Sequence, residues 1–393
     1  MSLSKRVSHI KPAPTLQLSA KINELKAKGV DIVGFGAGEP DFDTPDFVKS
    51  ACMQAIKEGK TKYTPSAGIL ELREALSEKL RKENSIEYSP SEIVITAGAK
   101  MALYLVFLAL LDEGDEVLLP SPYWVSYPEQ IMLCGGLPVL VHLREEEGFV
   151  LTAENLKPYI TEKTKMLVLN SPSNPTGAVV PEEELKKIVE MCVEKGIFIV
   201  SDECYEAFIY DGKKFVSPAS LSKEAREITF TINAFSKTFS MTGWRVGYVA
   251  CPQRYAKVIA DINSQTISNA TSFAQYGALQ ALKDPQAKTF VKHMKETFER
   301  RRNLAYELLQ EIPGISVVKP EGAFYIFPNL KIYSNKLGSD LKLVEYLIEE
   351  GKVACVPGSA FGAEGYVRIS YCVSEDTIRE GINRIKTALE KLS

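Results

Sequence analysis

The sequence is poor in histidine. Its three histidines, His9, His142 and His293, are scattered, and no two stand at the spacing of a metal-binding pair. This scarcity argues against a zinc hydrolase and against a histidine-based catalytic triad. We expect no metal site.

The chain also lacks a long apolar run. The longest, residues 101–111, ends before Asp112 and is shorter than the roughly 20 residues that span a bilayer. The first residues, MSLSKRVSHIKPAP, lack the apolar stretch of a signal peptide, and the seven cysteines form no CxxC pair. We therefore expect a reduced, cytoplasmic protein with no membrane partner.

An excess of charge of either sign is missing as well. Lys and Arg number 47 against 50 Asp and Glu, a net charge of −3, and no long basic block occurs. This balance argues against electrostatic capture of nucleic acid or of a membrane surface. With 45% apolar residues, the composition is that of an ordinary globular protein, and a small molecule is the expected partner.

Short apolar runs alternate with amphipathic stretches in the middle of the chain. The runs are residues 92–96, 116–120, 137–141, 165–170, 196–202, 228–233 and 246–250. Several are apolar on both faces and are separated by helical patterns such as residues 181–196. This arrangement predicts an α/β fold with a mostly parallel central sheet that helices cover on both faces.

The flanking segments leave this alternation. A helix start capped at Thr44 and a helix over 68–83 come before the sheet. After it we expect a helix over 285–311, strands at 314–320 and 322–328, a helix over 338–350, strands at 352–356 and 366–371, and a helix over 374–391. This pattern predicts a smaller α+β domain. The expected division is an N-terminal arm (1–14), a large domain (45–285) and a small domain that joins 15–44 to 286–393.

Ligands of an open parallel sheet bind beyond the carboxyl ends of its strands. Asp202 ends an apolar run, and either it caps a following helix or it pairs with a positively charged ligand atom. Lys237 and Arg245 lie among small and apolar residues, which favours a lysine with a lowered pKa that acts as nucleophile and proton carrier. Ser236 and Arg245 are suited to bind a phosphate.

Two further segments suit a ligand. Residues 96–103, TAGAKMAL, join a strand to a helix start whose free N–H groups attract anions, although every α/β unit has such a junction. Asn174, between two Ser/Asn-Pro steps, belongs to a rigid connection or points its amide at a ligand. In GFGAGEPDF, Glu39 replaces the third glycine of a dinucleotide motif, which excludes that reading.

An anion site, a carboxylate, an activated lysine and an oriented amide are together what pyridoxal phosphate requires. Seven motifs are spread along the chain in the order of a known family: GAGEPDF, KYTPSAGI, SPYWVSYPE, NSPSNPTG, SDECY, NAFSKTFSMTGWRVGY and VRISY. From about Val7 to the last helix, the sequence resembles the fold-type I, class I/II aminotransferases, most closely the prokaryotic aspartate aminotransferases.

The resemblance implies a site for pyridoxal 5'-phosphate. Lys237 would bind the cofactor covalently and shuttle the proton, while Asp202 would keep the ring nitrogen protonated. Residues that would contact the ring or its phosphate are Tyr205 and Asn174 at the ring oxygen, Trp124 on the ring face, and Ala99, Lys100, Ser236, Arg245 and the second subunit's Tyr63 at the phosphate. The last contact implies a homodimer with shared active sites.

The resemblance also assigns the substrate contacts. Arg368 would clamp the α-carboxylate with Gly38, Trp124 and Asn174, and Lys100 would bind the distal carboxylate unless it is an outward-pointing helical lysine. Two departures occur: Ser173 stands where the family more often has a second Asn, and residues 125–127 lack the histidine that some branches place behind the pyridinium carboxylate. The second departure leaves the partner of Asp202 open.

The expected reaction is transamination between L-aspartate and 2-oxoglutarate by a ping-pong mechanism, with amino acids and 2-oxo acids as partners. An aromatic, prephenate or alanine aminotransferase is the nearest alternative. A β-lyase or decarboxylase would instead release pyruvate and ammonia, or carbon dioxide. A non-catalytic regulator is disfavoured because every chemical position of the motifs is filled.

Overall fold

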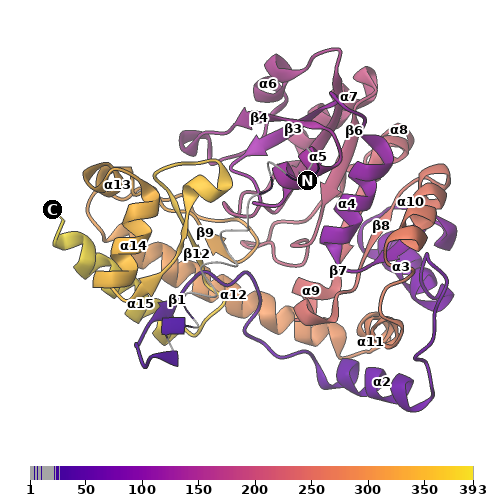
Figure 1. Cartoon of the computed structure of the whole chain (residues 1–393), viewed down its shortest axis with the longest axis horizontal. Coiled ribbons are helices and arrows are strands. Elements are labelled where there is room, and N and C mark those ends of the chain that lie inside the picture. Colours follow the sequence, from indigo (N-terminus) through magenta and orange to yellow (C-terminus); the bar gives the residue numbers. More distant parts are fainter. Residues whose placement is uncertain are drawn as a thin grey trace.

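The computed structural model describes residues 4, 7, 10, 22, 24, 25 and 27–392. A seven-stranded sheet lies at its centre, in the order β2-β8-β7-β6-β5-β3-β4 (Figure 1). Its strands are β2 (Ile93–Thr96), β3 (Glu116–Ser121), β4 (Leu137–His142), β5 (Thr164–Asn170), β6 (Phe198–Asp202), β7 (Thr229–Ala234) and β8 (Gly247–Ala250). From β4 to β7 all neighbours are parallel, and β8 alone runs antiparallel to its two neighbours. The predicted mostly parallel sheet is confirmed.

Helices cover both faces of this sheet, because its strands are apolar on both sides. In β5, Met166 and Val168 pack into one cluster with α4, whereas Leu167 and Leu169 pack into another with α7. Each such side chain contributes roughly 1.5–3 kcal/mol on burial. The helices of this part are α2 (Asp46–Lys57), α3 (Leu70–Glu83), α4 (Ala99–Leu110), α5 (Tyr127–Leu133), α6 (Ala153–Leu156), α7 (Glu182–Lys195), α8 (Lys223–Ile228), α9 (Phe235–Thr238), α10 (Gln253–Thr266) and α11 (Ser272–Lys283).

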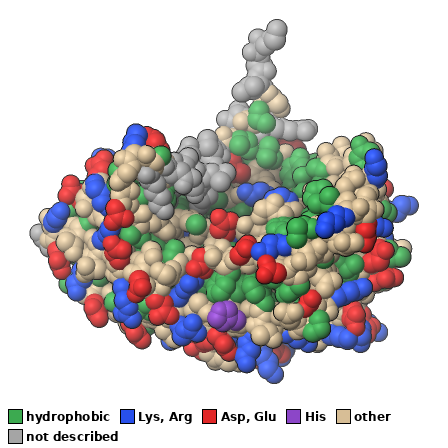
Figure 2. Space-filling view, turned by 90° about the horizontal axis from the view of Figure 1, so that it is seen from below, with side chains coloured by type: hydrophobic (Ala, Val, Ile, Leu, Met, Phe, Trp, Pro, Cys, Tyr) green, Lys and Arg blue, Asp and Glu red, His purple; other side chains and the backbone are tan. Residues whose placement is uncertain are grey.

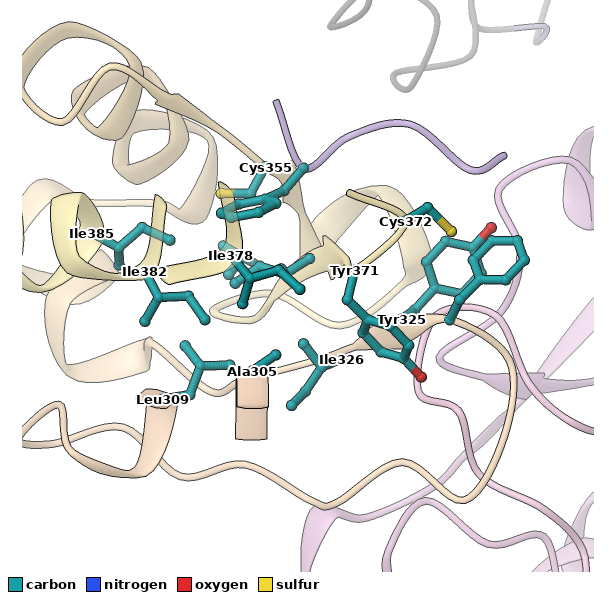
Figure 3. Close-up of a cluster of buried hydrophobic side chains, with 14 of the residues drawn as sticks. Ala305, Leu309, Tyr325, Ile326, Cys355, Tyr371, Cys372, Ile378, Ile382 and Ile385 are labelled. Carbon is teal, nitrogen blue, oxygen red and sulfur yellow. The ribbon is translucent and has the colours of Figure 1, made fainter. Parts of the chain in front are cut away.

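The C-terminal part has its own apolar cluster, part of which Figure 3 shows. Ile378, Ile382 and Ile385 stand on one face of α15 and share this cluster with Ala305 and Leu309 of α12. The helices here are α12 (Ala287–Gln310), α13 (Lys331–Leu337), α14 (Asp340–Glu350) and α15 (Glu375–Glu390). Two small sheets accompany them: β1 (Val33–Gly34) with β10 (Val353–Ala354), and β11 (Val356–Pro357) with β12 (Val367–Ser370) and β9 (Tyr325–Ile326).

Two local predictions are wrong, and one helix was missed. Thr44 does not cap α2, because its hydroxyl donates to the carbonyl oxygen of Ser240 at 2.6 Å. Residues 314–320 form no strand and contribute only a single bridge, from Ser316 to Asn329. Helix α13 was not predicted. The expected domain division stays a prediction, and most of the expected N-terminal arm lies outside the described residues.

The surface agrees with the balanced composition. In the view of Figure 2, acidic and basic side chains are interspersed across the face of the molecule. Within the part of the chain that the structure describes, no helix is both long and apolar enough to cross a membrane.

Candidate active site

The carboxyl ends of the parallel strands open into a cavity of about 390 Å³. At this edge β5 ends with Asn170, which pairs in register with Asp202 at the end of β6, and β7 ends with Ala234, where α9 begins. Nearly all the residues predicted for the site line this one cavity. They are Gly38, Ala99, Lys100, Trp124, Asn174, Asp202, Tyr205, Ser236, Lys237, Arg245 and Arg368.

Tyr63 is the predicted site residue that does not line this cavity. It lies in the connection between α2 and α3, and 88% of it is exposed. The sequence-based expectation places it in the site of a second subunit. That placement stays a prediction.

Lys237 extends from the short helix α9 into the cavity. Its Nζ donates a hydrogen bond to the carbonyl oxygen of Gly38 and lies 5.9 Å from the centre of the Phe324 ring. Burial lowers the pKa of the Lys237 amine, and the charge of Arg368 lowers it further. A lysine in this setting gives up its proton more readily than a solvated one, which suits a nucleophile and proton carrier.

Asp202 is a buried carboxylate with defined partners. The hydroxyl of Tyr127 donates to its Oδ2 at 2.7 Å, and the backbone N–H of Cys204 donates to its Oδ1 at 3.2 Å. Burial raises the pKa of Asp202, whereas these hydrogen bonds and the charge of Lys237 lower it. A turn follows β6, not a helix, so the alternative in which Asp202 caps a helix is wrong.

Arg368 comes from β12, which belongs to a different sheet from Asp202, and it lines the same cavity. Its Nη1 donates to Oδ1 of Asn174 at 3.0 Å, and its Nη2 donates to the carbonyl oxygen of Gly36 at 2.8 Å. The guanidinium stacks on the Tyr325 ring, 4.4 Å from its centre. Its Nε is buried without a hydrogen-bond partner among the described residues, and a buried donor of this kind is costly unless a ligand satisfies it.

The start of α4 lies beside Arg245. Gly98 precedes the helix with a φ of 81°, and a Cβ there would lie 2.3 Å from Nη2 of Arg245. Arg245 is held by hydrogen bonds from its guanidinium to the carbonyl oxygens of Thr242 and Ala97. The helix N–H groups and the guanidinium therefore face the same space, where a phosphate would bind.

Lys100 lines the cavity, although the residue is exposed in this chain. Its Nζ lies 4.9 Å from the centre of the Trp124 ring, and burial, with the charge of Arg245, lowers the pKa of its amine. Among the described residues, four basic side chains line the cavity against two carboxylates, those of Glu39 and Asp202. The cavity is thus suited to ligands with more than one negative charge.

Residues 30–385 match the family described as aminotransferase class I and II. The chain belongs to this family. A probable aspartate/prephenate aminotransferase of Aquifex aeolicus is 67% identical over 99% of each chain, and the aspartate aminotransferase of Bacillus subtilis is 51% identical over 100% of each. The solved aspartate aminotransferase of Thermus thermophilus with maleate superposes with a TM-score of 0.94, at 44% identity over 99% of this chain and 100% of that one.

Three residues of the aminotransferase cavity were missed by sequence reasoning. Asn170 ends β5, and its Nδ2 donates to the carbonyl oxygen of Asp202 at 3.1 Å; the strand-end rule that found Asp202 would have found it too. Tyr325 lies 2.9 Å from Tyr205, hydroxyl to hydroxyl. Tyr325 stands in an apolar segment typical of a core, and Tyr127 stands in the motif SPYWVSYPE, which gave no reason to single it out.

A larger cavity, of about 830 Å³, is lined in part by residues of α3, α9 and α11. Its buried polar groups are already paired with one another: Glu206 accepts hydrogen bonds from Lys79, Asn84 and Asn233. The chemistry-bearing side chains predicted from the sequence line the smaller cavity instead. The smaller cavity is therefore the candidate active site.

Glu203, next to Asp202, is a buried carboxyl group whose ionisation should make the stability of the aminotransferase depend on pH. Its Oε1 accepts hydrogen bonds from Ser201 at 2.9 Å and Ser217 at 2.6 Å, and burial raises its pKa to about 8. The folded state thus holds the proton more tightly than the unfolded state. The stability that this proton contributes is present at low pH and is lost as the pH rises towards about 8.

We expect Glu203→Gln to be increasingly more stable than the wild type as the pH rises. The difference in the free energy of unfolding should grow by about 1 kcal/mol per pH unit between about pH 5 and about pH 8. Denaturant unfolding across this range measures it, with exposed Glu154→Gln as the control. A difference that stays constant with pH would show that Glu203 is ionised in the folded protein.

Proposed function

We propose that this aminotransferase transfers the amino group of L-aspartate to 2-oxoglutarate, with pyridoxal 5'-phosphate as cofactor. The observation that carries the proposal is the placement of Lys237, Asp202 and Arg368 around one cavity. The relatives named above as aspartate or aspartate/prephenate aminotransferases support the choice of substrate. Amino acid and 2-oxo acid would use the same cavity in turn, which is a ping-pong mechanism.

The residues present fit pyridoxal phosphate. The start of α4, with Ala99 and Lys100, and the side chains of Ser236 and Arg245 offer donors for its phosphate. Asp202 is a carboxylate suited to its ring nitrogen, and Trp124 offers a flat face. When bound, the cofactor supplies an electron-accepting ring that stabilises negative charge on the substrate carbon.

The chain's own groups do the remaining work. Lys237 would hold the cofactor covalently and, once released as a free amine, would carry the proton from the substrate carbon to the new position that transfer of the amino group requires. Asp202 would keep a proton on the ring nitrogen through its negative charge. Tyr205 and Asn174 would donate hydrogen bonds to the ring oxygen.

Two basic side chains at different places in the cavity, Arg368 and Lys100, would bind the substrate. Arg368 would bind the α-carboxylate through the N–H groups that Asn174 and Gly36 leave free, because a guanidinium has five donors. Gly38 and Trp124 would complete this side. Lys100, beside Trp124, would reach the distal carboxylate of aspartate or glutamate.

A panel of amino donors with 2-oxoglutarate tests the proposal. We expect the highest kcat/KM for aspartate, with glutamate appearing as the second product in equal amount. The 67% identity to a probable aspartate/prephenate aminotransferase favours prephenate as a second acceptor, so prephenate belongs in the panel. Release of ammonia or carbon dioxide without glutamate would overturn the proposal.

Lys100→Ala should selectively reduce activity on acidic substrates. Loss of one charged contact to a carboxylate corresponds to about 10- to 100-fold in kcat/KM. The measurement is kcat/KM for aspartate and for phenylalanine in the wild type and the variant. Equal losses for the two donors would remove Lys100 from specificity and leave it only a role in cofactor binding.

We propose a homodimer in which Tyr63 reaches the phosphate of the other subunit's cofactor. Tyr63→Phe should then weaken pyridoxal phosphate binding by about 10-fold, as expected for one hydrogen bond to a charged group. A cofactor titration measures this, with Tyr306→Phe as the control at an exposed hydroxyl on α12. An unchanged dissociation constant would exclude Tyr63 from the site.

The proposal also covers the cellular compartment and the domain division. The chain would act in the cytoplasm, which is supported by its seven free cysteines. Residues 15–44 with 286–393 would form a small domain that closes on residues 45–285 when substrate binds.

A further inference from the structure

Tyr127 connects two groups that meet the proposed cofactor from different sides. It is the first residue of α5 and is 1% exposed. Its hydroxyl donates to Oδ2 of Asp202 at 2.7 Å, and its ring packs edge-on against Trp124 with ring centres 5.2 Å apart and planes at 79°. Its backbone N–H also donates to the carbonyl oxygen of Trp124 at 3.0 Å.

We propose that Tyr127 is the positioning residue that keeps Asp202 ionised and aimed at the ring nitrogen of the cofactor. The inference rests on the proposed function, because it assumes that Asp202 meets this nitrogen. It goes further by naming Tyr127 as the partner of Asp202, which the sequence left open. Tyr127 does not touch the reacting atoms and acts through Asp202.

The physical reason lies in the balance of effects on the pKa of the Asp202 carboxyl group. Burial opposes its negative charge, and among the groups that favour the charge the hydrogen bond from Tyr127 is the largest. Without this bond the carboxyl would hold its own proton more tightly. Less negative charge would then face the ring nitrogen, and the nitrogen would lose its proton more easily.

The hydroxyl also supplies this hydrogen bond without titrating. Burial raises the pKa of Tyr127 well above its ordinary value, so it remains a neutral donor near neutral pH. The other titratable groups around Asp202 are Cys204, Tyr205 and Lys237. Burial raises the pKa of Cys204 and of Tyr205 well above their usual ranges, and that of Lys237 is lowered.

The decisive experiment uses the holoenzyme loaded with pyridoxal phosphate that carries ¹⁵N in its ring. The nitrogen chemical shift reports protonation directly and does not depend on turnover. We expect a protonated nitrogen in the wild type across about pH 6 to about pH 8.5. In Tyr127→Phe, which keeps the contact with Trp124, the nitrogen should lose its proton within this range, and cofactor affinity should fall about 10-fold or more.

Tyr127→His provides a second variant with a distinct signature. An imidazole can change its charge in the physiological pH range, unlike a phenol or a phenyl ring, so the ¹⁵N shift or the cofactor dissociation constant should show a new pH-dependent step. Tyr333→Phe is the matched control, because it removes a hydroxyl that donates to the carbonyl oxygen of Pro313 at 2.6 Å away from the cavity. It should leave both measurements unchanged.

The outcomes separate this inference from the proposed function. If the wild type does not bind the cofactor, or binds it with an unprotonated nitrogen, the proposed role of Asp202 fails. If the wild-type nitrogen is protonated and Tyr127→Phe gives the same ¹⁵N shift and affinity, the role of Tyr127 is overturned. A lowered melting temperature of Tyr127→Phe with an unchanged ¹⁵N shift would also overturn it, because Tyr127 would then serve stability alone.

Discussion

Lys237→Ala should lower kcat/KM for aspartate by at least about 10⁴-fold, the upper end of what one acid–base group contributes. The large effect is expected because the same amine would attach the cofactor and carry the proton. Lys100 cannot replace it, since its Nζ lies over Trp124 and it belongs to the start of α4. Steady-state kinetics on the cofactor-loaded variant measures the loss.

Borohydride reduction of the loaded enzyme, followed by peptide mass spectrometry, identifies the lysine that holds the cofactor. In the wild type the pyridoxyl group should be found on Lys237, and in Lys237→Ala it should be absent. Lys213→Ala is the control, because this surface lysine pairs with Glu321. Labelling of another lysine in the wild type, or a variant within about 100-fold of wild-type activity, would contradict the assignment.

The strands of the central sheet could be predicted because their apolar residues are continuous. Each predicted run agrees with an observed strand to within a few residues, as in residues 165–170 against β5. Prediction failed where distant contacts decide local structure. Thr44 has a favourable residue type for a helix cap, yet its hydroxyl is used by Ser240 and Trp244, about 200 positions along the chain.

Residues 314–320 illustrate a related failure. Their apolar residues suit a strand, but Pro313 precedes them, Pro320 ends them, and the carbonyl oxygen of Pro320 accepts a hydrogen bond from Arg302 at 2.8 Å. The backbone N–H of Ile315 donates to the carbonyl oxygen of Ile312 at 3.3 Å, within the preceding turn. Only Ser316 makes a bridge to Asn329.

The site residues likewise fall into those that local sequence patterns predict and those that they do not. Asp202, Lys237 and the start of α4 could be inferred from their positions after strands, because parallel strands bring their carboxyl ends to one edge. Arg368 lies 131 positions after Lys237 in a different sheet, so only the family resemblance placed it in the site. The hydrogen bond from Tyr127 to Asp202 depends on how α5 packs, which no local pattern encodes.

Arg368→Lys should reduce kcat/KM about 10²- to 10³-fold for every amino donor, acidic or not. A guanidinium can offer two parallel N–H groups to a carboxylate, whereas an ammonium is a point charge. Loss of a buried charged contact of this kind corresponds to about 3–4 kcal/mol. Pyridoxal phosphate affinity should change little, because the phosphate-binding groups lie at the start of α4 and at Arg245.

The uniform loss is what separates Arg368 from Lys100. Both would bind carboxylates, but the α-carboxylate is common to all amino acids and the distal one is not. Arg301→Lys is a matched control, because Arg301 is also buried and also makes a two-pronged contact, with Asp41 at 2.7 and 2.8 Å, yet does not line the cavity. If Arg301→Lys lost as much activity, or if Arg368→Lys spared phenylalanine, the α-carboxylate would have to be bound elsewhere.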